Sequence, residues 1–229
     1  LQHIRDLKAS VDHPLVRGAM RYLVQTYDSD AQAWPFVPPE VTEAPRAPWW
    51  QYHQDLRQFL ANPRAEIIGY LFQFPDLFPA KERHALLADV CSYLDEHHRS
   101  LKMHEILCYV RLIETDNLPA VERDYLGALL EPLILSEVAT DPKSWDDYVL
   151  KPLQVASAPD SVFAPLLKDS LDHNLDYEIA RQGADGSWEP NWSWGDVYPE
   201  AWLHAKRAWQ SVLTIATTRS LLAYKRIAF

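Results

Sequence analysis

The clearest candidate for acid–base chemistry is a polar pair at the start of an apolar helical segment. Between residues 101 and 115 apolar side chains recur on nearly every helical face, and His104 and Glu105 are the polar residues nearest the start. Burial favours the protonated form of a carboxyl group, so we predict that Glu105 is buried and is the proton donor, with His104 beside it. In the alternative, Glu105 pairs with an arginine and His104 hydrogen-bonds a backbone carbonyl.

Acidic side chains also share one face of the segment that precedes Arg181. Asp169, Asp172, His173 and Asp176 follow one another at helical spacings of three and four, so they fall on one side of a helix. Such a face could ligate a divalent ion or share protons. A solvated outer stripe produces the same spacing in a chain this acidic, and we favour that interpretation. The sequence therefore predicts no metal ligands and leaves any cofactor unassigned.

Six tryptophans lie outside the helical stripes, in two proline-bearing segments at 34–50 and 188–198. They are Trp34, Trp49, Trp50, Trp188, Trp192 and Trp194. Proline fixes the backbone, so both segments are expected to be rigid loops. Aromatic faces stabilise cations and stack on sugars and isoprenoids, so we predict that these residues bind a small-molecule ligand. The equally supported alternative is that they cap the ends of a ring of helices.

Composition limits the classes of partner. The 229 residues carry 32 acidic and 22 basic side chains, for a formal charge of -10. This charge repels phosphate backbones, so nucleic acid is not an expected partner. No apolar run is long enough for a transmembrane segment. Cys91 and Cys108 both lie in apolar helical patterns, where buried free thiols are expected, and this fits a reducing, cytoplasmic location.

The fold class that the sequence predicts is all-α. Glycine is scarce, with six residues, and apolar side chains recur at spacings of three and four rather than two. We expect a single domain over residues 1–229, with Asp12 as the N-cap of its first clear helix. The expected helices cover 13–27, 62–74, 80–98, 101–115, 120–138, 162–181 and 199–224.

A short motif resembles a repeat found in a known group of helical proteins. The heptapeptide Gln-Gly-Ala-Asp-Gly-Ser-Trp, which begins at Gln182, matches the Q-x-x-x-G-x-W pattern of squalene and hopene cyclases. There the glutamine satisfies backbone groups at a helix end, the glycine permits a tight turn and the tryptophan ring stacks over the glutamine. Gln182, Gly186 and Trp188 match these roles. A degraded copy without the glycine follows the first helix, from Gln25 to Trp34.

The resemblance implies the α/α toroid of the terpenoid cyclases and protein prenyltransferases, or a partial toroid of helical hairpins. A full toroid needs more helices than this chain supplies, so an incomplete ring is expected and Leu1 need not be the native start. The resemblance further implies an isoprenoid or other apolar small molecule bound in a central cavity. The D-x-D-D acid motif of class II terpene cyclases is absent, and no zinc-ligand pattern of the prenyltransferases can be placed.

Two other classes of function stay open beside this interpretation. One is a carbohydrate-active or carbohydrate-binding α/α protein, and the other is a noncatalytic interaction module. The repeated order of helix, glutamine, aspartate-bearing turn and tryptophan also predicts a geometry. Equivalent turns in a ring of hairpins emerge on the same rim, so the two tryptophan loops are expected to meet and form the mouth of the ligand site.

Overall fold

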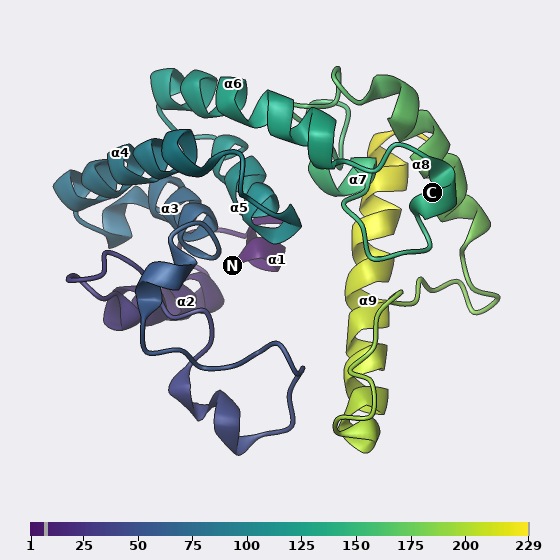
Figure 1. Cartoon of the computed structure of the whole chain (residues 1–229), viewed down its shortest axis with the longest axis horizontal. Coiled ribbons are helices and arrows are strands. Elements are labelled where there is room, and N and C mark those ends of the chain that lie inside the picture. The colour runs from purple at the N-terminus through teal and green to yellow at the C-terminus, as the bar shows by residue number, and fades with distance from the viewer. Residues whose placement is uncertain (7–8, 229) are drawn as a thin grey trace. The chain divides into compact units, whose positions relative to one another are not determined.

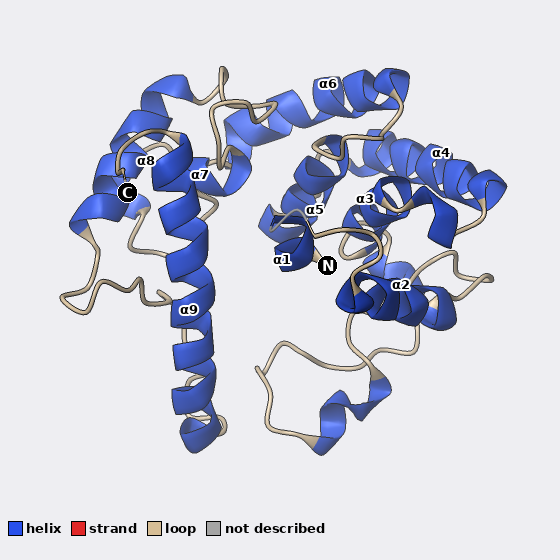
Figure 2. Cartoon of the chain, turned by 180° about the vertical axis from the view of Figure 1, so that it is seen from behind, coloured by secondary structure: helices blue, strands red, loops and turns tan. Residues whose placement is uncertain are grey.

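The computed structural model describes residues 1–6 and 9–228, and their regular structure is helical (Figure 2). Within these residues, extended pairing is limited to two isolated bridges, Asp28 with Ala33 and Val138 with Leu150. The all-α prediction is therefore confirmed. The expected helices are present to within a few residues except that the one expected from residue 162 begins at Lys168, after Pro165. A proline disfavours helical geometry in the residue before it, which explains the later start.

The chain divides into two compact units. Unit 1 consists of Leu1–Pro38 and Tyr52–Leu133, and unit 2 consists of Pro39–Gln51 and Ile134–Phe229. The division falls inside the first tryptophan loop, so Trp34 belongs to unit 1 whereas Trp49 and Trp50 belong to unit 2. Three expectations stay predictions: that residues 1–229 form one domain, that the helices form a partial toroid, and that the two tryptophan loops share one rim.

Unit 1 is a set of helices, joined by short turns from α3 onward and by a long loop between α2 and α3 (Figure 1). Its helices are α1 (Gln2–Asp6), α2 (Pro14–Thr26), α3 (Arg64–Gln73), α4 (Ala80–His97), α5 (Met103–Ile113) and most of α6 (Ala120–Glu137), with 3-10 turns η2 (Leu56–Phe59) and η3 (Pro75–Leu77). The predicted N-cap of α2 is wrong. The helix begins at Pro14, so His13 is the N-cap residue, and its Nδ1 accepts the Leu15 backbone N–H at 3.3 Å, whereas the Asp12 carboxylate pairs with Arg17.

The core of unit 1 forms around α3, which packs against both α4 and α5 and is buried along most of its length. Gly69 allows the close approach to α5, since a Cβ there would lie 2.8 Å from Thr115 Oγ1. Two polar contacts hold α4 in place. The Arg64 guanidinium, itself buried, pairs with Asp89, and the Tyr109 hydroxyl donates to the Val90 carbonyl at 3.0 Å.

Unit 2 contains the end of α6, η1 (Pro39–Glu43), η4 (Pro142–Ser144), α7 (Pro152–Val155), α8 (Lys168–Ala180) and α9 (Pro199–Ala223). Leu175, Trp188 and Leu221 form a buried cluster that anchors the C-terminal part of α9. The N-terminal half of α9 extends away from α7 and α8 (Figure 1). The apolar side chains of this half are only partly covered.

Three buried tryptophans use their indole N–H in the same way. Each Nε1 donates to a carbonyl in the last turn of the preceding α-helix or just beyond it. Trp34 donates to Leu23 in the last turn of α2 at 2.7 Å, Trp145 donates to Ala139 just after α6 at 2.7 Å, and Trp188 donates to Glu178 in the last turn of α8 at 2.8 Å. The exposed fractions of the three residues are 1%, 0% and 3%. These indole caps satisfy both a buried donor and a carbonyl close to a helix terminus.

An aspartate-centred turn precedes each indole cap. The aspartate Oδ1 accepts backbone N–H groups two or three residues further on: Asp28 from Asp30 and Ala31, Asp141 from Lys143, and Asp185 from Ser187. Before Trp188 the turn is tightened further by Gly186, whose φ is +81°, and by the Gln182 amide, which donates to the Gly186 carbonyl at 2.9 Å. Helix, aspartate turn and buried tryptophan therefore recur three times among the described residues.

The segment from Trp188 to Tyr198 runs along α9 in the opposite direction. The Trp188 backbone N–H donates to Thr214 Oγ1 at 3.2 Å, and the Trp194 ring packs 5.5 Å from the Trp202 ring. Between them, Glu189 pairs with Lys206 at 2.8 Å. This proline-bearing loop is thus held by side-chain contacts along its length.

We predict that Trp188→Ala lowers the free energy of unfolding by about 3 kcal/mol or more, because it leaves a cavity in the core of unit 2 and an unpaired carbonyl on α8. Trp188→Phe should cost less, since it keeps most of the ring volume and loses the hydrogen bond, worth about 1 kcal/mol. Urea denaturation followed by circular dichroism measures both effects. Trp49→Ala is the matched control, because Trp49 is 51% exposed. Equal urea denaturation midpoints for Trp188→Ala and wild type would contradict the structural role of Trp188.

Candidate functional site

Glu105 lies half-exposed in the first turn of α5, so the prediction that it is buried is wrong. Its Oε2 accepts the backbone N–H of Lys102 at 2.8 Å, which caps the helix start. Continuous burial in α5 begins one residue later, at Ile106, because the first turn lies at the margin of the core. His104 is exposed, and desolvation by neighbouring atoms together with Arg111 lowers its pKa. The structure thus gives Glu105 a capping role, and a catalytic role for either residue stays a prediction.

Glu66 on α3 is a largely enclosed carboxylate of unit 1, with 14% of its side chain exposed, and the sequence analysis missed it. Its Oε2 accepts from Arg111 Nη1 at 2.8 Å, and its Oε1 accepts the Tyr70 hydroxyl. Cys108 Sγ lies 3.8 Å from the same Oε2. Burial opposes the charge on Arg111, but the Glu66 carboxylate outweighs this and raises the pKa of the guanidinium. Glu66 and Arg111 are therefore an ion pair that joins α3 to α5.

Neither cysteine has the character of a nucleophile. Burial, assisted by Glu66, raises the pKa of the Cys108 thiol to about 12, and burial with Glu122 raises that of Cys91 to about 11. The thiolate is the reactive form of cysteine. Both side chains are free thiols in buried positions, as the helical pattern predicted.

The acidic face of α8 is exposed to solvent. Asp169, Asp172, His173 and Asp176 all lie on the surface, and Arg226 pairs with Asp172 at 3.9 Å and also with Asp176. Across residues 1–6 and 9–228, no group of three or more His, Cys, Asp or Glu side chains could hold a metal ion. The shared face is a charged outer stripe, partly neutralised by arginine.

A second buried charge cluster lies next to Trp188. The Glu178 carboxylate is 3.9 Å from Lys151 Nζ and 3.3 Å from Arg181 Nη1, and Lys151 Nζ sits 4.7 Å from the centre of the Tyr177 ring. Burial raises the pKa of Glu178 against the effect of its two cations, and burial lowers the pKa of Lys151. Because Lys151 and Glu178 are both buried, this cluster holds α7 against α8 and offers no open site.

The six tryptophans that the sequence predicts to bind a ligand fall into two classes, buried and partly open. Trp34 and Trp188 are buried indole caps, and Trp194 is buried against Trp202. Trp50 and Trp192 are half-buried, and Trp49 is exposed. The structure therefore leaves Trp49, Trp50 and Trp192 with surface that a ligand could cover.

Trp192 is the centre of a three-ring aromatic cluster in unit 2. Its ring lies edge-to-face with Tyr148, at 5.8 Å and 70°, and with Trp209 on α9, at 5.4 Å and 79°. We call Tyr148, Trp192 and Trp209 the aromatic cluster. Tyr148 is 55% exposed and Trp209 is half-buried, so the cluster reaches the surface.

Polar side chains hold the aromatic cluster. The Asn191 amide donates to the carbonyls of Asp146 and Asp147, at 3.2 and 2.8 Å, and so fixes the loop beside Tyr148. Gln210 Nε2 donates to Glu189 Oε1 at 3.0 Å. Side-chain hydrogen bonds therefore hold the segments on either side of Trp192.

Neither Trp209 nor Tyr148 is among the candidate binding residues of the sequence analysis. Their convergence on Trp192 depends on how the loop lies along α9, which no local spacing reveals. The proline-bearing context of Trp192 was the one available signal.

Comparison with known proteins gives no match, whether with protein families, with curated proteins or with solved structures. The protein is therefore classed by its fold alone, as an all-α chain with an aromatic cluster at its surface. None of the described helices is long and apolar enough to cross a membrane.

The raised thiol pKa values predict slow alkylation of the native protein. At pH 8 the thiolate fraction of Cys91 is lower than that of an ordinary thiol by a factor of about 100, and that of Cys108 is lower still. Iodoacetamide labelling with site-resolved mass spectrometry should show Cys91 reacting before Cys108. Because both thiols titrate above pH 8, each rate should rise about tenfold per pH unit up to pH 10. Labelling in urea is the control, and native rates equal to those in urea would contradict the prediction.

Proposed function

We propose that this protein binds an apolar or ring-shaped small molecule through the aromatic cluster. The observation that carries the proposal is the contrast among its tryptophans. Trp145 and Trp188 are sealed in the core with their indole N–H groups satisfied, whereas Tyr148, Trp192 and Trp209 meet edge-to-face and remain partly open. Partly open aromatic faces on a supported loop offer contact area at low side-chain entropic cost.

The ligand class that we propose first is an isoprenoid or a similarly apolar molecule. The likeness of Gln182, Gly186 and Trp188 to the cyclase repeat supports this class, and a partial toroid of helical hairpins is retained as part of the proposal. Aromatic faces suit isoprenoids because they contact alkyl surface and stabilise cations. The proposal is one of binding rather than reaction, because Glu105 caps a helix and Glu66 is paired with Arg111.

A carbohydrate is the second candidate, and one observation favours it. Asn191 and Gln210 are the sequence neighbours of Trp192 and Trp209, and planar polar side chains near aromatic rings can bind the hydroxyl groups of a sugar while its ring stacks. The two candidates differ in what they require. A sugar needs these polar side chains, whereas an isoprenoid needs the rings alone.

We predict that Trp192→Ala weakens ligand binding at least tenfold, because Trp192 contacts both other rings of the cluster. The probes are farnesyl diphosphate and farnesol for the apolar class, and cellohexaose and maltohexaose for sugars, followed by calorimetry and tryptophan fluorescence. Gln210→Ala should weaken sugar binding and leave isoprenoid binding within about threefold. Tyr22→Ala, an exposed aromatic change on α2, is the matched control. Affinity unchanged in Trp192→Ala would refute the site.

The same titration tests whether the two tryptophan loops share a ligand. If they form one mouth, Trp49→Ala should also weaken binding several-fold, although it lies far from Trp192 in the sequence. If Trp49→Ala binds as wild type does while Trp192→Ala fails, the aromatic cluster is the site and the shared mouth is excluded.

A further inference from the structure

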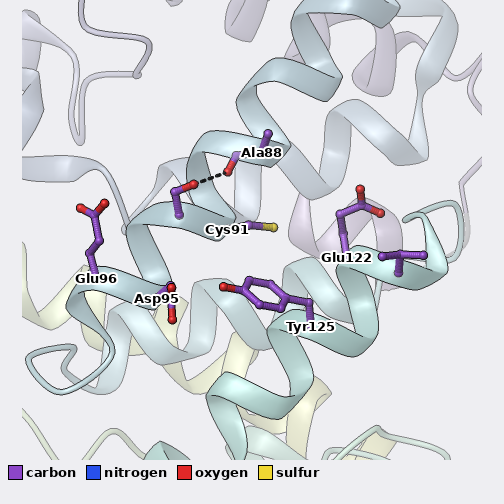
Figure 3. A pocket seen from close by; sticks show the side chains of 8 residues that line it. Ala88, Cys91, Asp95, Glu96, Glu122 and Tyr125 are labelled. Carbon is purple, nitrogen blue, oxygen red and sulfur yellow. Dashed lines mark hydrogen bonds between the residues drawn. The ribbon is translucent and has the colours of Figure 1, made fainter.

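A groove lies within unit 1, between α4 and the first turns of α6 (Figure 3). It has a volume of about 470 Å3 and is open to solvent. Cys91, Asp95 and Glu96 line it from α4, and Val121, Glu122 and Tyr125 line it from α6. The groove is separate from the aromatic cluster, which belongs to unit 2.

The apolar part of this groove is open to solvent. Val121 is 77% exposed, and the Tyr125 ring is also exposed, whereas Cys91 beneath them is buried. In Figure 3 the Tyr125 ring lies along the groove with its hydroxyl directed toward Asp95. A valine and a tyrosine ring thus present adjacent apolar surface to solvent on the first turns of one helix.

The charge of the groove is entirely negative. Asp95, Glu96 and Glu122 contribute three carboxylates, and the lining contains no basic side chain. Within the part of the chain that the structure describes, none of the three forms an ion pair. Arg123, the nearest arginine in sequence, is directed elsewhere, since its Nη2 donates to the Thr115 carbonyl at 2.7 Å.

We propose that the α4–α6 groove docks a basic, partly apolar segment of another protein. An arginine of the partner would pair with the carboxylates and stack on Tyr125, while an apolar neighbour covers Val121. Charge complementarity carries the choice of partner, because three carboxylates without an ion-pair partner among the described residues attract cations and repel acidic chains. Arginine fits better than lysine, because its planar guanidinium binds carboxylates in a bidentate manner and stacks on aromatic rings.

The test uses a fluorescein-labelled amphipathic helical peptide of about twelve residues, with arginines on one face and leucines on the other. Fluorescence polarisation at low salt measures its binding to the full chain. A groove variant combines Asp95→Asn, Glu96→Gln and Glu122→Gln. A control variant combines Glu40→Gln, Glu43→Gln and Asp160→Asn, which are exposed positions elsewhere, so both variants change the net charge equally.

We expect the groove variant to bind the peptide at least tenfold more weakly than wild type, and the control variant to remain within about threefold. Val121→Ser should weaken binding by about threefold or more, which long-range attraction alone would not produce. A matching peptide with glutamates for arginines should not bind. Absence of binding to wild type, or equal losses in the groove and control variants, would overturn the proposal. Circular dichroism confirms that each variant is folded.

Discussion

The hydrogen bond from a buried indole N–H to a carbonyl near a helix end is the interaction on which both units depend. A helix leaves its last carbonyls without intrahelical partners, and a buried tryptophan brings a donor that must be satisfied. One bond meets both needs at the ends of α2, α6 and α8. It also fixes where the chain goes next, because the ring must enter the core where the helix stops. The aspartate turn before each ring directs the chain to that point.

Buried charge is the second constraint, and each unit handles it within its own core. Glu66 with Arg111 joins α3 to α5, and Glu178 with Lys151 and Arg181 joins α7 to α8. Removing charges from water is costly, so such groups persist where their partners are also enclosed. Glu178 has a double role, because its carbonyl accepts the indole cap while its carboxylate binds the cations. Polar side chains in these cores thus specify which helices meet.

Function depends on the aromatic and apolar groups that the cores leave uncovered. Chemically identical tryptophans serve as sealed caps in one place and as partly open faces in another, so residue type does not separate support from binding. The surroundings do: Trp188 has its donor satisfied and its ring enclosed, whereas Trp192 meets two rings at the surface. Incomplete burial also distinguishes Val121 and Tyr125. Both are exposed on α6, whose other side is buried, and they lie beside carboxylates that form no ion pair with any described residue.

The sequence by itself determined the helical class and nearly all helix ranges, because the apolar spacing and the prolines act over a few residues. It also indicated that Trp188 belongs to a turn with Gln182 and Gly186, a relation local to the chain. Only the tertiary structure decided that Glu105 is a half-exposed cap, that Glu66 is largely enclosed and paired with Arg111, and that Tyr148 and Trp209 converge on Trp192. The burial of a side chain and the convergence of distant residues depend on which segments pack together. The spacing of residues along one helix does not reveal which other helix packs against it.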